Sequence, residues 1–200
     1  MSKAISFLGG DLAYRHDSSA VVRIDVEEGA YSVAAVREWR PSKGNPLVPS
    51  VVRAEMIEVA KVAHCNEIAL DLHGIDDAKE QFSKASIAIF ELPNGQSGKV
   101  AMYQVAKELL HAKRVRIPWL ERRLISQIKA IIGKPTSGGG LSIAAARNAS
   151  GHGDVCSAFV AALYLAHERN GSPVTRLSTD QLHRIGHSSR WGRVSRDRGF

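Results

Sequence analysis

Three aspartates stand where apolar stretches end or begin, and they are the residues best placed to do chemistry. Asp11 follows an apolar run and two glycines, Asp71 closes a second apolar run, and Asp154 opens a third. An unpaired charge is costly to bury in a strand or helix. Each carboxylate is therefore either a turn or capping residue or a ligand for a positively charged group.

The simpler interpretation differs for each aspartate. Asp11 suits a turn after glycines, Asp71 suits a strand end that caps the next turn, and Asp154 suits a helix N-cap. If the strands that end near Asp11 and Asp71 are neighbours, the last helix can bring Asp154 over them. Three such carboxylates repel one another, and a pair of divalent cations removes the repulsion. Mg²⁺ prefers oxygen ligands, and two ions about 3.5–4 Å apart can drive phosphodiester hydrolysis.

The elements that must position these carboxylates follow from apolar periodicity and from Gly and Pro punctuation. Three strands joined by short connections predict an antiparallel meander, and the short apolar run at 68–70 is typical of a buried parallel strand. The order predicts an α/β fold, a mixed sheet flanked by helices. We expect strands at 4–10, 19–26, 30–39, 67–72, 87–92 and 114–117, helices at 50–64, 76–84, 98–112, 119–132 and from 154 onward, and a glycine-tipped hairpin or loop at 133–148.

Length and composition predict one soluble domain. The chain has 200 residues, of which 44% are apolar and 24% charged, and no apolar run approaches the length of a membrane span. The two cysteines lack metal-site spacing and suit a reduced compartment as packing residues. We expect a domain at 1–170 and a flexible basic tail at 171–200. The tail carries six Arg and two Asp, so more than half of the chain's net charge of +7 lies there. Such a charge permits a polyanionic partner.

Two other patterns carry little chemistry. The segment GQSGK at 95–99 lacks both the glycine spacing and the Ser or Thr of a phosphate-binding P-loop, so a helix start is the better interpretation. Trp39, Trp119 and Trp191 are scattered along the chain, and they do not predict a stacking platform for bases.

Three segments together resemble a known family. GGDLAYRHDSSAVV, IALDLHG and GHGDVCSAFVAALYLA, in that order, are similar to the motifs of the nuclease domain of phage terminase large subunits, which has a ribonuclease H-like fold. The glycine-rich hairpin ahead of the last motif also fits that family. The resemblance covers residues 4–169.

The resemblance implies a metal-dependent endonuclease that cuts double-stranded DNA during viral genome packaging, with two Mg²⁺ or Mn²⁺ ions. Asp11, Asp71 and Asp154 would be the catalytic metal ligands, with Asp11 bridging both ions. It also implies a packaging ATPase, a small terminase subunit and a portal as partners, in the host cytoplasm. The ATPase segment usual in the family is not in this sequence, so we expect it to be removed or encoded separately.

Residues near the aspartates are candidates for supporting roles. Asp17 and His152 flank the site and can orient a ligand or a water, although a turn residue and a structural hydrogen-bonding residue are the simpler interpretations. Arg15, Lys99 and Arg147 are candidates for contacts with DNA phosphates.

Three other functions remain open from the sequence. A Holliday-junction resolvase of the same fold also uses a carboxylate cluster. A sugar-kinase-like or actin-like ATPase also opens with Gly-x-Asp on a strand, but it needs far more chain. A basic DNA-binding or packaging module would keep the carboxylates as structural residues.

Overall fold

The structure is a computed structural model that describes residues 4–71, 76–136, 140–145 and 153–170. It contains the predicted alternation of strands and helices, and most element ends lie within a few residues of the expected ones. The elements are β1 (Ile5–Asp11), β2 (Ser19–Glu27), β3 (Ala30–Trp39), α1 (Pro49–Val62), β4 (Glu67–Leu70), α2 (Asp76–Lys84), β5 (Ala88–Glu91), α3 (Gly95–His111), β6 (Val115–Arg116), α4 (Arg122–Lys129), β7 (Ile131–Pro135), β8 (Leu141–Ala145) and α5 (Asp154–Asn170).

A six-stranded mixed sheet forms the centre of the fold, in the order β5-β4-β1-β2-β3-β6. The meander β1–β2–β3 is antiparallel, whereas β4 pairs in parallel with β1 on its other side. The neighbourhood of β1 and β4, on which the predicted site depends, is therefore present. The carboxyl ends of both strands lie at the same edge of the sheet.

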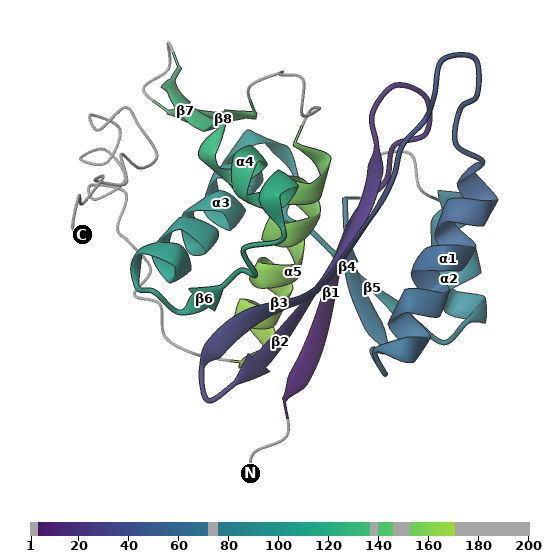
Figure 1. Cartoon of the computed structure of the whole chain (residues 1–200), viewed down its shortest axis with the longest axis horizontal. Coiled ribbons are helices and arrows are strands. Elements are labelled where there is room, and N and C mark those ends of the chain that lie inside the picture. The colour runs from purple at the N-terminus through teal and green to yellow at the C-terminus, as the bar shows by residue number, and fades with distance from the viewer. Residues whose placement is uncertain (1–3, 72–75, 137–139, 146–152, 171–200) are drawn as a thin grey trace.

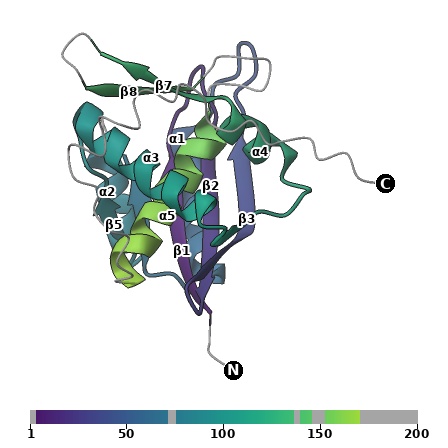
Figure 2. The ribbon, with the colours of Figure 1, turned by 90° about the vertical axis from the view of Figure 1, so that its left-hand side faces the viewer.

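Helices cover both faces of the sheet (Figure 1). Helices α1 and α2 pack on one face, and α3, α4 and α5 pack on the other, as the rotated view in Figure 2 also shows. Helix α5 lies directly against β1 and β2 and is mostly buried up to Ala166, because every residue from Val155 to Ala166 other than Ser157 is apolar or aromatic. A helix that is apolar all round is one that the core encloses.

Several element ends differ from the expected ones, and α3 begins at Gly95 instead of 98. The helix predicted at 119–132 is shorter, since α4 spans Arg122–Lys129 and the β-branched pair Ile131-Ile132 begins strand β7. Strand β4 ends at Leu70, so Asp71 follows the strand and does not lie within it. The predicted hairpin is present as the antiparallel pair β7–β8, and its tip at 137–139 lies outside the described residues.

Helix α5 ends at Asn170, and the tail predicted at 171–200 lies outside the described residues. Among the residues that the structure describes, no helix is long and apolar enough to cross a membrane.

Candidate metal centre at the carboxyl ends of strands β1 and β4

Asp11 is the last residue of β1, and the strand's alternation directs its side chain toward α5. Side chains at every second strand position share one face. Phe7 belongs to the core on the α5 side, and Gly9 lies against the backbone of α5. Asp11 therefore faces the helix that begins with Asp154.

Asp71 occupies the matching position directly after the neighbouring strand β4. In the parallel β1–β4 ladder, Gly10 pairs with Leu70, so Asp11 and Asp71 each come directly after this last pair. Asp71 is exposed, and it lines the same pocket as Asp11. The expected convergence of these two carboxylates is thus built by strand register.

Asp154 is the first residue of α5, and it is not the N-cap. The backbone N–H of Ser157 donates to the carbonyl oxygen of Gly153 at 2.8 Å, which makes Gly153 the N-cap. Gly153 has φ +95°, a conformation that favours glycine. The capping interpretation of Asp154 is therefore wrong. Its Oδ2 instead accepts a hydrogen bond at 3.0 Å from the backbone N–H of Ser18, in the turn after β1.

The carboxylates act on one another electrostatically, with Asp11 at the centre. Burial and the nearby charge of Asp154 raise the pKa of Asp11 to about 7, against a hydrogen bond from Ser157 that lowers it. The charges of Asp71 and Asp17 raise the same pKa further. Asp11 is therefore the group whose ionised form gains most from a cation at this edge of the sheet.

A pocket of about 460 Å³ opens at this edge. Strand ends β1 and β4 form one wall, and α3 and α5 form the other. Its walls offer carboxylate oxygens, hydroxyls and one amine, and they include Asp11, Asp71, Lys99, Tyr103 and Ser157.

The donor chemistry of the pocket fits a hard divalent cation. The acidic side chains that line it are the carboxylates of Asp11 and Asp71. Among the described residues of its lining there is no Cys or His, the ligands that would favour a softer metal. Mg²⁺ is usually held by one or two carboxylates with waters and substrate phosphates completing its shell. In the described part of the chain, no three His, Cys, Asp or Glu side chains converge on one ion position. Asp11 and Asp71 thus match a site in which protein supplies only part of the coordination.

The structure brings only some of the remaining predicted site residues close to Asp11. Asp17 is half-buried and close enough to influence Asp11, and Lys99 lines the pocket. Arg15 is exposed and lines a separate hollow beside Leu47. The predicted residues His152 and Arg147 lie outside the described residues.

Two pocket residues were missed by sequence reasoning. Ser157 follows Asp154 by three positions, a helical spacing that places both on one face of α5, and this signal was available. Tyr103 looked like a core residue of α3. Its hydroxyl lies 3.5 Å from the Ser157 hydroxyl, and burial raises its pKa.

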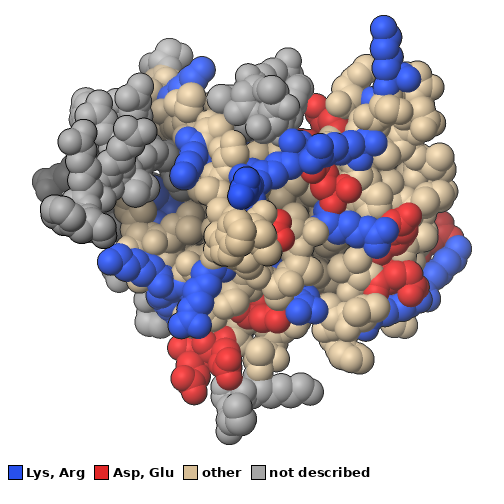
Figure 3. Space-filling model, viewed as in Figure 1, with Lys and Arg blue, Asp and Glu red and all other residues tan. Residues whose placement is uncertain are grey.

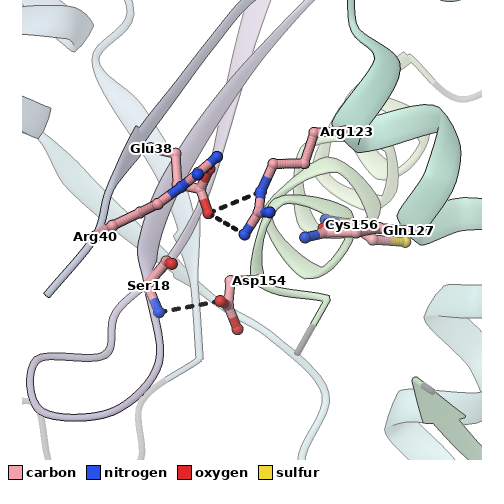
Figure 4. Close-up of polar contacts among 7 residues, drawn as sticks. All are labelled: Ser18, Glu38, Arg40, Arg123, Gln127, Asp154 and Cys156. Carbon is pink, nitrogen blue, oxygen red and sulfur yellow. Dashed lines mark hydrogen bonds and ion pairs between the residues drawn. The ribbon is translucent and has the colours of Figure 1, made fainter. Parts of the chain in front are cut away.

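A polar cluster behind Asp154 had no sequence signal at all. It links Ser18 in the turn after β1, Glu38 near the end of β3, and Arg123 and Gln127 on α4 (Figure 4). These residues are far apart in the chain, and only the tertiary fold brings them together.

Comparison with known proteins identifies solved structures that share the fold. No protein-family model matches the chain, and no curated protein matches it either. Among solved structures, the large terminase nuclease from thermophilic phage G20c with bound magnesium is 18% identical, with a TM-score of 0.66 over 82% of this chain and 82% of that chain. The large terminase nuclease domain of Thermus phage P74-26 is also 18% identical, with a TM-score of 0.64 over 83% of this chain and 80% of that one.

A third neighbour is a longer protein. The HK97 bacteriophage large terminase is 17% identical, with a TM-score of 0.64 over 82% of this chain, and the chain spans 40% of its length. These likenesses show that the chain has the ribonuclease H-like fold of terminase nuclease domains, as the resemblance in the sequence implied.

Proposed function

We propose that the chain is the nuclease domain of a viral terminase large subunit, a metal-dependent endonuclease that cuts double-stranded DNA during genome packaging. The observation that carries the proposal is the placement of Asp11. Asp11 ends β1 beside Asp71, and burial together with the charges of Asp154 and Asp71 raises its pKa. The fold around it is shared with terminase nucleases. Structures of the G20c nuclease with bound magnesium and with bound cobalt support a divalent ion in this fold.

Two divalent ions, Mg²⁺ or Mn²⁺, are the proposed cofactors. Asp11 and Asp71, which line the pocket, would hold one ion, and Asp11 and Asp154 would hold the second. Such ions supply an activated water and stabilise the charge on the leaving oxygen of the phosphodiester. Because the pKa of Asp11 is raised to about 7, binding of a cation near neutral pH would release a proton from this carboxyl, and cation affinity would rise with pH.

Side chains of the protein then orient the proposed metal ligands and neutralise the charge of the DNA backbone. The hydrogen bond from Ser157 holds the Asp11 carboxylate toward α5, and Asp17 adds negative charge at the edge of the site. Lys99 on the pocket wall is placed to neutralise a backbone phosphate of the DNA. Figure 3 shows Lys and Arg side chains across the face that carries α4 and the end of β3, interleaved with acidic ones.

The packaging context gives the proposed partners. Double-stranded DNA is the substrate, and a packaging ATPase, a small terminase subunit and a portal complete the machine in the host cytoplasm. The longer HK97 large terminase, of which this chain matches 40%, is consistent with a further domain in such a machine.

Plasmid cutting tests the proposal directly. The purified protein is expected to nick and linearise supercoiled plasmid with Mn²⁺ or Mg²⁺ and not with a chelator, and Asp11→Asn is expected to abolish cutting while the protein stays folded. Asp25→Asn is the matched control, because Asp25 is also a strand aspartate but bonds Ser6 and Arg23 at the far end of the sheet.

Three results would contradict the proposal. An intact plasmid at every metal concentration, with DNA still bound, indicates a non-catalytic packaging module. Cutting by Asp11→Asn at the normal rate removes the site assignment. Strong preference for four-way junctions over linear duplex indicates a Holliday-junction resolvase.

A further inference from the structure

We propose that Glu38 is a positioning residue for Asp154, acting through Ser18. This inference rests on the proposed function, since it concerns how one proposed metal ligand is held in place. Glu38 lies near the end of β3, two strands away from Asp11, and it does not line the pocket. Its influence on the site passes through hydrogen bonds.

Ser18 is the connecting residue, because it lies against both partners at once. Its backbone N–H donates to Asp154 Oδ2 at 3.0 Å, and its side chain is close enough to the Glu38 carboxylate to lower the pKa of that group. Ser18 and Asp154 are 8% and 6% exposed, so neither bond is shared freely with solvent. The direction of the Ser18 N–H is thereby tied to the position of Glu38.

Glu38 is itself held from two sides, as Figure 4 shows. Its Oε1 accepts two hydrogen bonds from the Arg123 guanidinium, at 3.0 and 2.7 Å, and its Oε2 accepts two from Arg40, at 2.9 and 2.8 Å. Bidentate pairs of this kind fix geometry as well as charge. Against the effect of burial, these bonds and the one from Ser18 lower the pKa of Glu38, so the carboxylate is ionised near neutral pH.

Helix α4 extends this arrangement to the first turn of α5. Arg123 and Gln127 are four residues apart and therefore lie on one face of α4. Arg123 bonds Glu38, and Gln127 Oε1 accepts a hydrogen bond at 2.9 Å from the backbone N–H of Cys156. The same face of α4 thus holds both Glu38 and the first turn of α5, which begins with Asp154.

Stability alone is a weak explanation for this cluster. Buried ion pairs contribute little net stability, because desolvation offsets their attraction. What the cluster supplies is orientation: Ser18 presents its N–H to Asp154 Oδ2, and this bond fixes the direction of the carboxylate. Partners that orient a metal ligand in this way typically change metal affinity or activity by about 10–100-fold when they are removed.

The test compares Glu38→Gln and Ser18→Ala with a matched control, Glu55→Gln. Glu55 is also a carboxylate bonded by an arginine, Arg37, and by the Trp39 indole, but it lies on α1 across the sheet from Asp154. Three quantities are measured for each protein: Mn²⁺ affinity from the resonance of free Mn²⁺, the cutting rate at saturating Mn²⁺, and the exchange rate of the Ser18 amide proton in metal-free protein.

We expect Glu38→Gln to weaken Mn²⁺ binding about tenfold and to speed exchange of the Ser18 amide proton, while Glu55→Gln changes neither. Ser18→Ala should weaken Mn²⁺ binding similarly, and the double variant should be no weaker than Glu38→Gln, because both changes break one connection. A melting temperature lowered equally in Glu38→Gln and Glu55→Gln shows that the Mn²⁺ effect is not a loss of folding.

The outcomes separate the two proposals. A wild-type protein that binds Mn²⁺ and cuts DNA, together with a Glu38→Gln variant of unchanged Mn²⁺ affinity, overturns the role of Glu38 alone. Unchanged exchange of the Ser18 amide in Glu38→Gln overturns that role whether or not the protein is a nuclease. A wild-type protein that neither binds Mn²⁺ nor cuts DNA overturns the proposed function, and the inference with it.

Discussion

A methyl group placed on Gly9 would lie 2.2 Å from the backbone nitrogen of Ala162. Strand β1 and helix α5 therefore touch backbone to backbone at this point, with no side chain between them. The contact brings Asp11, two residues further along β1, to the helix turn that carries Asp154 and Ser157. Glycine at position 9 is thus a condition of the proposed metal centre.

Replacing Gly9 with alanine should separate β1 from α5. The added carbon would also meet the carbonyl oxygen of Ala158 at 2.4 Å, and backbone atoms cannot move aside cheaply. Overpacking of this kind costs about 1–3 kcal/mol and sometimes more. We expect urea denaturation to show a loss of at least this size in the free energy of unfolding, with reduced cutting.

Gly133→Ala is the control for that experiment. Gly133 is also a strand glycine, but an added carbon there would meet only the Leu141 side chain at 3.4 Å, an ordinary contact. Its free energy of unfolding should stay close to that of the wild type. Equal losses in the two variants would show that the β1–α5 contact is not special.

The raised pKa of Asp11 predicts a pH-dependent stability in metal-free protein. Its pKa is about 7 in the folded protein, where burial and Asp154 raise it from an ordinary value of 3.8. Between these values the folded protein binds a proton that the unfolded chain has released. This contribution to stability is complete below pH 4 and is lost as the pH rises to about 7.

Urea denaturation across this pH range measures the effect as a difference between two proteins. Asp11→Asn cannot titrate, so its free energy of unfolding should gain on that of the wild type by a few kcal/mol between pH 4 and 7. Saturating Mg²⁺ should remove the gain, because the cation stabilises the ionised carboxylate in the wild type. A difference that does not change with pH would contradict the cause assigned to this pKa.

Lys99 should contribute to DNA affinity through charge alone. It lines the pocket beside Asp11, with its Nζ 6.0 Å from the centre of the Tyr103 ring. Lys99→Gln should weaken duplex binding regardless of sequence and reduce the slope of log affinity against log salt by about 1. Lys61→Gln on α1, where Lys61 pairs with Glu58, should leave the slope unchanged. Fluorescence anisotropy over a salt series measures both.

Gln127 should stabilise the start of α5. It is 2% exposed, and its removal leaves the buried N–H of Cys156 without this acceptor. We expect Gln127→Ala to cost about 1–3 kcal/mol, and Gln127→Glu, which keeps an acceptor oxygen, to cost less. Thermal unfolding provides the measurement. Gln104→Ala removes a more exposed glutamine bonded to Glu108, and an equally large loss there would argue against a capping role for Gln127.

The sequence predicted the parts of this molecule that depend on local pattern. Apolar periodicity and Gly and Pro positions located the elements and the mixed sheet, and the aspartates at element ends were identified as candidates for one site. The structure places Asp11 beside Asp71 through strand pairing. The position of Asp154 relative to Ser18 could not be predicted, because it depends on how α5 docks.

Residues of the pocket wall and of the cluster behind Asp154 were harder to predict from the sequence, for a physical reason. Tyr103 has the spacing of a core residue in an apolar helix, and only its contact with Ser157 brings its hydroxyl to the pocket. Glu38 and Arg123 look like ordinary surface charges in the sequence. Their ion pair joins β3 to α4, and contacts between distant segments leave no periodic signal.

The parallel pairing of β1 with β4 also bears on when the proposed site is assembled during synthesis. The β1–β2–β3 meander involves near neighbours in the chain, whereas Asp71 and Asp154 reach Asp11 only after the crossover to β4 and the docking of α5. Non-local contacts of this kind form late. A nascent or half-folded chain thus lacks the assembled carboxylates, and a cation bound at the proposed site would stabilise the native state alone.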